Sequence, residues 1–155
     1  MIILGIDPGT ASTGYGIIKK KRLFECIDYG VISTTPNSEL GERLRKINNE
    51  LSRIIKKHKP EVLAIENLFF FKNLKTAIPV SRAIGAILLT TAKKKLPVKE
   101  FTPLQIKLAI TGNGRAEKKE VQKSLKKLLR LKEIPRPSHA ADALAVAITY
   151  VLKEV

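Results

Sequence analysis

The sequence predicts a single α/β domain built on a mixed five-stranded sheet with helices on both faces. Three observations support this prediction: the chain has 155 residues, 44% of them are hydrophobic, and three strand-like segments precede an alternation of helices and strands. A chain of this length forms one domain and buries a core without disulfide or metal support. Hairpin-linked strands followed by alternating helices and strands are typical of a mixed sheet with two covered faces.

The five strands are predicted from short apolar runs. Residues 2–6 form a buried strand that ends in turn residues, and residues 14–18 and 24–33 form two more, with a basic turn at 19–22 between them. Their short links predict an antiparallel meander. Residues 62–66 and 97–101 supply the fourth and fifth strands, and right-handed crossovers would place the fourth beside the first.

Five helices are predicted from helical spacing of apolar residues and from end signals. They span residues 40–57, 74–95, 103–110, 117–129 and 138 to about 152. The second of them is long and carries few charges despite Pro79 near its start. Ser138, which follows a proline-rich break, is the expected N-cap of the last helix.

The charge of the chain predicts a polyanionic partner. Lys and Arg number 29 against 14 Asp and Glu, which gives a net charge of +15 and a pI near 10.1. Residues 93–135 hold 13 basic and 4 acidic side chains, and residues 19–59 hold 11 and 5. Such an excess indicates nucleic acid first and an anionic membrane second. A solvated, lysine-rich surface without a ligand is the plainer alternative.

Other features exclude several classes of protein. Cys26 is the only cysteine, which excludes a disulfide framework and a cysteine-type zinc site, and a lone thiol fits a reducing cytosol. Residues 1–7 run into a carboxylate and do not resemble a signal peptide. The longest uncharged candidate, 83–92, is too short to span a bilayer, so we expect a cytoplasmic protein.

Four side chains predict a metal site at one edge of the sheet. Asp7 and Glu66 end the first and fourth strands, whose carboxyl ends meet at the same edge. His139 and Asp142 lie three residues apart, on one face of the first turn of the last helix. Neighbouring carboxylates repel unless a cation neutralises them, and Mg²⁺ and Mn²⁺ favour such oxygens. Three acids and an imidazole could hold two ions about 3.5–4 Å apart for phosphodiester hydrolysis.

Three of these four residues also have a structural alternative. Asp7, which precedes Pro8 and Gly9, could be only a turn former, Asp142 could only favour the helix dipole, and His139 could be structural. If His139 belongs to the site, it is either a metal ligand or the base that takes a proton from water. Glu66 is harder to explain structurally, because it ends an apolar strand and apolar residues follow it.

Two further segments are candidates for nucleic-acid contact. Residues 69–71 are three consecutive Phe beside Lys72, and they form either a hydrophobic anchor or a wedge and stacking platform for unpaired bases. The loop at 112–115 offers backbone N–H groups for phosphates. The candidate DNA-binding side chains are Phe69, Phe70, Lys72, Lys107, Arg115, Lys118 and Lys119.

The order and spacing of three motifs resemble the bacterial RuvC Holliday-junction resolvases over residues 1–152. These motifs are GIDPGT at 5–10, AIE at 64–66 with Phe69 shortly after, and SHAADALAVA at 138–147. The resemblance implies a ribonuclease-H-like fold, with residues 1–155 as one nuclease domain. It also implies a homodimer that nicks two strands of a four-way DNA junction symmetrically.

The resemblance assigns roles by position. Asp7, Glu66 and Asp142 match the family's metal-binding catalytic acids, and His139 matches a fourth catalytic position where many members carry Asp and others His. Two Mg²⁺ ions per site are implied, and the imidazole leads us to expect activity with Mn²⁺ as well. Phe69 matches an aromatic residue that inserts at the crossover, and Lys107 and Lys118 match basic residues at the DNA face. The long second helix is implied to form the dimer, and the RuvA–RuvB branch-migration complex is the implied partner.

Three competing functions remain. The Asp7–Thr10 segment with Gly14 also resembles the first phosphate loop of actin-like ATPases, but 155 residues leave no room for their second lobe. A YqgF-type nuclease that processes ribosomal RNA precursors usually lacks the aromatic segment and this terminal acid pattern. A non-catalytic junction-binding protein would satisfy the basic charge alone, and metal-dependent cleavage distinguishes it from an enzyme.

Overall fold

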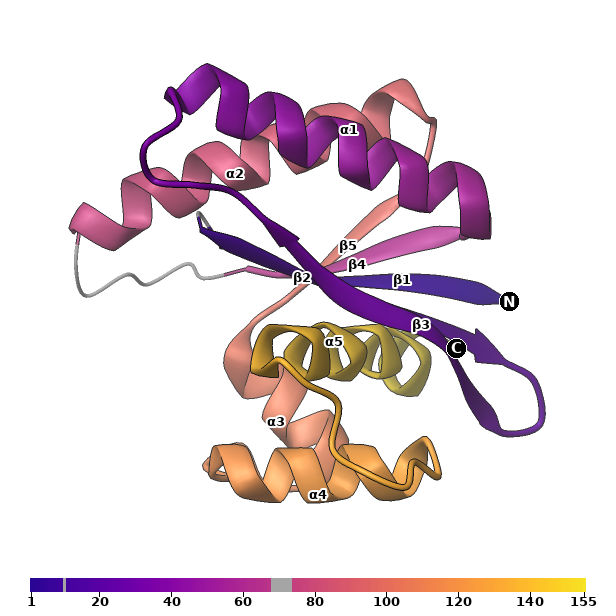
Figure 1. Ribbon diagram of the computed structural model, residues 1–155. Helices are drawn as coiled ribbons and strands as arrows, with labels where there is room; N and C mark the ends of the chain where they lie inside the picture. The colour runs from indigo at the N-terminus through magenta and orange to yellow at the C-terminus, as the bar shows by residue number, and fades with distance from the viewer. Residues whose placement is uncertain (10, 68–73) are drawn as a thin grey trace.

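A computed structural model describes residues 1–9, 11–67 and 74–155, within which five strands form one mixed sheet (Figure 1). The strands are β1 (Ile2–Asp7), β2 (Ser12–Lys20), β3 (Phe24–Ser33), β4 (Val62–Glu66) and β5 (Val98–Phe101). Their order across the sheet is β3-β2-β1-β4-β5. The predicted meander is confirmed by the antiparallel β1–β2 and β2–β3 pairs, and β4 lies parallel to β1 as expected.

The helices of the described residues cover both faces of this sheet. They are α1 (Leu40–His58), α2 (Leu74–Lys93), α3 (Pro103–Thr111), α4 (Lys118–Leu128) and α5 (Ser138–Glu154). The helices α1 and α2 lie on one face, and α5 lies on the other with α3 and α4 beneath it (Figure 1). Within the described residues, no helix has the length and apolar character needed to cross a membrane.

The helix α5 lies very close to the sheet, because β1 and β2 present glycines to it. A Cβ added to Gly5 would lie 2.0 Å from the carbonyl oxygen of Ala143, and one added to Gly14 would lie 2.0 Å from that of His139. The helix meets these glycines with small side chains, and Ala143 and Ala147 are completely buried. The first turns of α5 are therefore held directly over the carboxyl end of β1.

The structure corrects the predicted start of α5. Its N-cap is Pro137, whose carbonyl oxygen accepts the first bond of the helix from the Ala140 N–H at 3.0 Å. Ser138 is thus the first helical residue and makes no cap. Asp142 accordingly lies in the second turn, and no acid occupies the first. The helix dipole therefore does not explain why an acidic residue occupies position 142.

Other predicted boundaries also differ from the structure, most clearly at the end of the second strand and of the second helix. Lys19 and Lys20 belong to β2, because they pair with Glu25 and Phe24 of β3, so the turn is shorter than predicted. The second helix ends at Lys93, because Lys95 adopts a left-handed conformation with φ 55° and the Leu96 N–H donates to the Thr91 carbonyl at 3.0 Å. This bond satisfies a free carbonyl at the helix end in the Schellman manner.

Candidate metal centre

Asp7 and Glu66 lie side by side because β1 and β4 are parallel and in register. Ile6 pairs with Ile65, and the two acids are the next residue on each strand. Ile6 and Ile65 belong to the core beneath α1 and α2. Because side chains alternate along a strand, Asp7 and Glu66 point to the other face, toward α5. The predicted meeting of these carboxylates at one sheet edge thus follows from the register of the strands.

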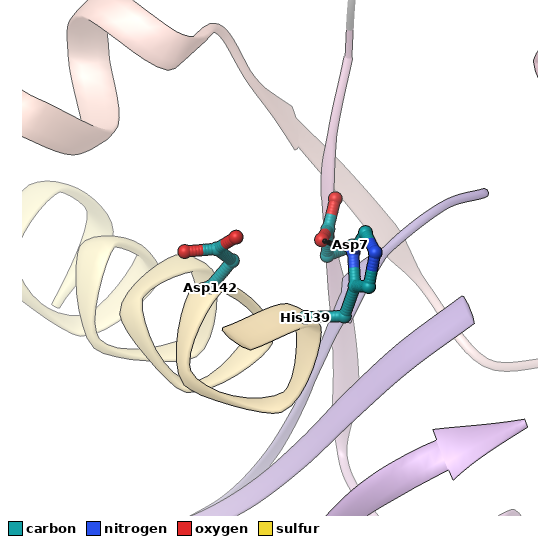
Figure 2. A group of neighbouring side chains, drawn as sticks. All are labelled: Asp7, His139 and Asp142. Carbon is teal, nitrogen blue, oxygen red and sulfur yellow. Dashed lines mark hydrogen bonds and ion pairs between the residues drawn. The ribbon is translucent and has the colours of Figure 1, made fainter. Parts of the chain in front are cut away.

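The start of α5 brings His139 and Asp142 to the same place (Figure 2). The Nδ1 atom of His139 lies 2.7 Å from Oδ2 of Asp7. One potential ligand atom from each of Asp7, His139 and Asp142 lies within 4.8 Å of the others. Three of the four predicted residues therefore form a compact donor set, and Glu66 lies beside Asp7 at the end of the neighbouring strand.

The carboxylates of this cluster are held in an unfavourable environment. Burial raises the pKa of Glu66 to about 8, and the charges of Asp7 and Asp142 add to the effect. Burial and the charge of Asp7 also raise the pKa of Asp142. Clustered, buried acids of this kind favour the uptake of protons or of a cation. Oxygen-rich sets with one imidazole suit Mg²⁺ and Mn²⁺, so the residues present fit a divalent metal site.

A lysine already supplies positive charge to the cluster. The Nζ atom of Lys118, at the start of α4, lies 3.1 Å from Oδ2 of Asp142. Its charge lowers the pKa of both Asp142 and Glu66 and so offsets part of the rise that burial causes. Sequence reasoning assigned Lys118 to DNA alone and missed this contact. The need of three crowded acids for a counterion was the available signal, but the pairing joins residues 24 positions apart and has no local pattern.

A cavity of about 250 Å³ adjoins the acids. Glu66, Asp142, Lys107 and Lys118 contribute its polar lining, and the rest is apolar. The apolar lining consists of Pro103, Ile106, Val121, Ala145 and Val146. The structure therefore brings two of the predicted DNA-binding lysines to the candidate metal site, whereas Arg115 and Lys119 are exposed residues outside the lining of this cavity.

The loop at 112–115 does not offer the free backbone donors that its glycines suggested. The Gly112 N–H donates to Leu108, the Asn113 N–H to the Thr111 hydroxyl, and the Arg115 N–H to Oδ1 of Asn113. The backbone of this loop is largely satisfied internally, so phosphate contacts here depend on side chains. The predicted contacts of Phe69, Phe70 and Lys72 lie outside the described residues, as does Thr10 of the first motif.

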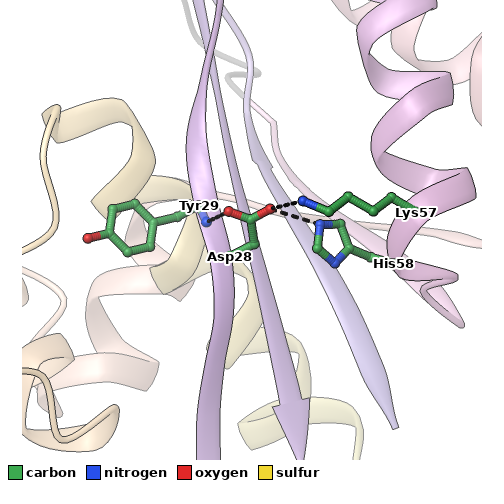
Figure 3. A network of polar contacts seen from close by, with 4 residues as sticks. All are labelled: Asp28, Tyr29, Lys57 and His58. Carbon is green, nitrogen blue, oxygen red and sulfur yellow. Dashed lines mark hydrogen bonds and ion pairs between the residues drawn. The ribbon is translucent and has the colours of Figure 1, made fainter.

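A second polar cluster lies on the α1 face of the sheet and is separate from the metal centre (Figure 3). Oδ2 of Asp28 on β3 lies 2.8 Å from Nε2 of His58 and 3.4 Å from Nζ of Lys57, both in the last turn of α1. The other oxygen, Oδ1, accepts the Tyr29 N–H at 2.9 Å. These contacts fasten the edge strand to the end of α1 and give the cluster a structural role.

The comparison with protein families identifies one match. The model of the family described as "Crossover junction endodeoxyribonuclease RuvC" matches residues 3–150. Relatives of that name include one from Petrotoga mobilis, 51% identical over 97% of this chain and 93% of its own length. Another, from Treponema denticola, is 52% identical over 96% of this chain and 84% of its own length.

Solved structures agree with these matches. Thermus thermophilus RuvC in complex with Holliday junction substrate has a TM-score of 0.94 and 36% identity, covering 98% of this chain and 93% of that one. The yeast mitochondrial Holliday junction resolvase Ydc2 has a TM-score of 0.72 at 11% identity, covering 97% of this chain and 77% of that one. The second likeness concerns the fold alone. Together they confirm the predicted mixed five-stranded, ribonuclease-H-like sheet.

Proposed function

The chain belongs to the RuvC family of crossover junction endodeoxyribonucleases, which resolve Holliday junctions, and we propose that it does so through a metal centre on Asp7, Glu66, His139 and Asp142. The main support for this proposal is that the ends of two paired strands and the first turns of α5 bring their acids together in one cluster. We take residues 1–155 as one nuclease domain and the cytoplasm as its location.

The protein's own residues would bind the metal ions, orient the imidazole ring and neutralise charge. Asp7, Glu66 and Asp142 supply carboxylate oxygens, and the Asp7 contact fixes the ring of His139. When bound, divalent ions would activate water and stabilise the leaving oxygen of the phosphodiester. Mg²⁺ is the proposed ion, two per site, with Mn²⁺ as an alternative that the imidazole favours. We assign His139 to the ligands because its ring nitrogen lies within the same 4.8 Å set.

The proposed DNA contacts surround this centre. Lys107 and Lys118 line the adjoining cavity, where their ammonium groups would meet phosphates next to the cleaved bond. Arg115 and Lys119 are exposed on the segment that leads into α4 and would contact the backbone further along. Phe69, Phe70 and Lys72 are proposed to contact the crossover, on the strength of the family resemblance.

We further propose a homodimer that contacts its partner through α2 and cuts two strands. The exposed face of α2 carries Ile78 and Leu89, which are 52% and 56% exposed. Gly85 lies between them and has open space above it. Exposed apolar side chains gathered on one helix are typical of a protein interface. The RuvA–RuvB branch-migration complex is the proposed cellular partner.

A junction-nicking assay tests the enzymatic function. A synthetic four-way junction is incubated with Mg²⁺, Mn²⁺ or EDTA, and the cuts are mapped to the nucleotide on all strands. We expect paired nicks with either metal and none in EDTA. An Asp7→Asn variant should bind the junction normally yet lose at least about 10³-fold in cleavage rate, because it removes a metal ligand.

The same assay separates the competing functions. Junction binding without any cut in either metal would leave only the non-catalytic binding function. Cleavage of a ribosomal RNA precursor in preference to the junction would support the YqgF-type alternative. Full cleavage by Asp7→Asn would remove Asp7 from the metal centre while leaving the resolvase activity in place.

A further inference from the structure

The outward face of α4 carries a continuous row of basic side chains. We define the α4 basic stripe as Lys119, Lys123, Lys126, Lys127 and Arg130. The spacing of Lys119, Lys123 and Lys126 by four and three residues, with Lys127 adjacent, places these four on one side of the helix, and Arg130 follows two residues after its end with φ 53°. Val121 and Leu125 face the core from the other side. The stripe therefore faces away from the core, on the layer of helices that lies farthest from α1 and α2 (Figure 1).

The charge of this stripe is not compensated by neighbouring acids. Among the described residues, none of its five members forms an ion pair, although Glu117, Glu120 and Glu133 are near in sequence. Glu117 and Glu120 are used at the start of α4, where they form a reciprocal capping box. Lys126 and Lys127 favour the negative end of the helix dipole, but Lys119 and Lys123 lie too early for that explanation.

The surface between these side chains is hollowed. Lys123, Lys126, Lys127 and Arg130 line a concavity of about 430 Å³, with Leu131 as its apolar member. Four cations around one concavity repel each other unless a polyanion or counterions occupy the space. The hollow therefore has the shape and charge to receive an anionic chain.

The stripe begins beside the metal centre and leads away from it. Lys118, which contacts Asp142, immediately precedes Lys119. From Lys119 to Lys127 the helix rises about 12 Å at 1.5 Å per residue. Duplex DNA carries a phosphate on each strand about every 3.4 Å along its axis, so this length matches roughly three to four base pairs.

We propose that the α4 basic stripe binds the phosphate backbone of a duplex arm next to the cleavage site. This inference rests on the proposed junction-cleaving function and assigns to DNA four residues beyond those already named: Lys123, Lys126, Lys127 and Arg130. DNA is favoured over an acidic protein segment because the stripe is continuous with the metal centre and its length suits a regular row of phosphates. Its contribution is to affinity, since backbone contacts carry no sequence information.

A salt titration of junction binding tests the stripe. The variant Lys123→Gln/Lys126→Gln/Lys127→Gln is compared with the parent and with Lys46→Gln/Lys56→Gln/Lys59→Gln. The control set removes the same charge from α1 and the residue after it, on the other face of the sheet. Binding is measured in EDTA over a range of salt concentrations, and single-turnover cleavage is measured with Mg²⁺ at saturating protein and low salt.

The stripe variant should bind at least about tenfold more weakly at low salt, and its salt slope should fall by about 2 to 3, because each phosphate contact contributes about 0.9. The control variant should change the slope by less than about 1, and the bound junction should be cut at the parent rate by both. The proposal would be overturned by equal salt slopes for the stripe variant and the control variant. It would also be overturned if the stripe bound an acidic protein and not DNA. A parent chain that cuts no junction would refute the proposed function, while the slopes would still decide on the stripe.

Discussion

At the scale of residues, the proposed metal centre is a set of acids that repel each other unless a cation neutralises them. Burial and the charges of Asp7 and Asp142 raise the pKa of Glu66, so the metal-free protein holds this proton more tightly than a free glutamate does. Lys118 offsets part of the negative charge through Asp142. A site of this kind trades stability of the free protein for affinity toward a divalent ion.

The raised pKa of Glu66 predicts how stability depends on pH. The folded state holds this proton up to about pH 8, whereas the ordinary value of the group is 4.5. The contribution of this group to the free energy of unfolding is therefore fully present below pH 4.5 and is lost as pH rises through about 8. Glu66→Gln removes this loss, on the order of a few kcal/mol. In EDTA, its Tm should exceed that of the parent at pH 9 and match it near pH 4.5.

The corresponding control is Glu133→Gln, which removes one exposed carboxyl outside the cluster and should not reproduce the gain in Tm at pH 9. Adding Mg²⁺ should raise the Tm of the parent more than that of Glu66→Gln. A Glu66→Gln variant with the same Tm profile as the parent would mean that this carboxyl is solvated and not part of the crowded cluster.

The role of His139 can be tested by its replacement. If the imidazole is a metal ligand, His139→Asp should keep cleavage within about tenfold of the parent, because a carboxylate also binds Mg²⁺. His139→Ala should lose about 10²-fold and recover in part at high Mn²⁺ concentration. The rate is measured between pH 6 and 9. A base role is supported instead if His139→Asp is as inactive as His139→Ala at every metal concentration.

At the scale of elements, the site depends on how closely α5 approaches β1 and β2. The sequence predicts that two strands end in carboxylates, because short apolar runs followed by an acid can be read locally. It does not reveal that Gly5 and Gly14 face the helix, since the distance between a helix and a sheet leaves no periodic signal. The true N-cap, Pro137, was missed for a related reason: Ser138 has the preferred chemistry, but backbone geometry decides the cap.

This close approach predicts the effect of one added methyl group. In Gly5→Ala, the new Cβ would lie 2.0 Å from the Ala143 carbonyl oxygen and 2.8 Å from the Ala147 nitrogen. Because these are backbone atoms, α5 must move, at a cost of about 1–3 kcal/mol or more. His139 and Asp142 move with it, so both Tm and metal affinity should fall. Gly41→Ala is the control, because open space surrounds that position on α1 and both quantities should be kept. An unchanged metal affinity in Gly5→Ala would mean that the site does not depend on this contact.

At the scale of the whole molecule, the net charge of +15 describes affinity for DNA and not the choice of a junction. Much of it lies on α4 and the segments beside it, where the α4 basic stripe would hold any duplex. Preference for four strands must then come from geometry, and the proposed dimer would present two metal centres to two strands at once. The described residues of one chain form one candidate centre, so in the proposed dimer the arrangement of two copies would decide the outcome.

The proposed dimer can be tested by placing a charge in its interface. Leu89→Glu places a charge on the exposed apolar face of α2, and burying it in an interface would cost several kcal/mol. Sedimentation should show monomers, and paired nicks in one junction should give way to slow, unpaired nicks. Leu152→Glu, at the 48% exposed Leu152 near the end of α5, is the matched control and should remain dimeric. Because the acids lie on the other face of the sheet, metal binding by a Leu89→Glu monomer should equal that of the parent. Paired nicking by such a monomer would separate resolution from dimerisation through α2.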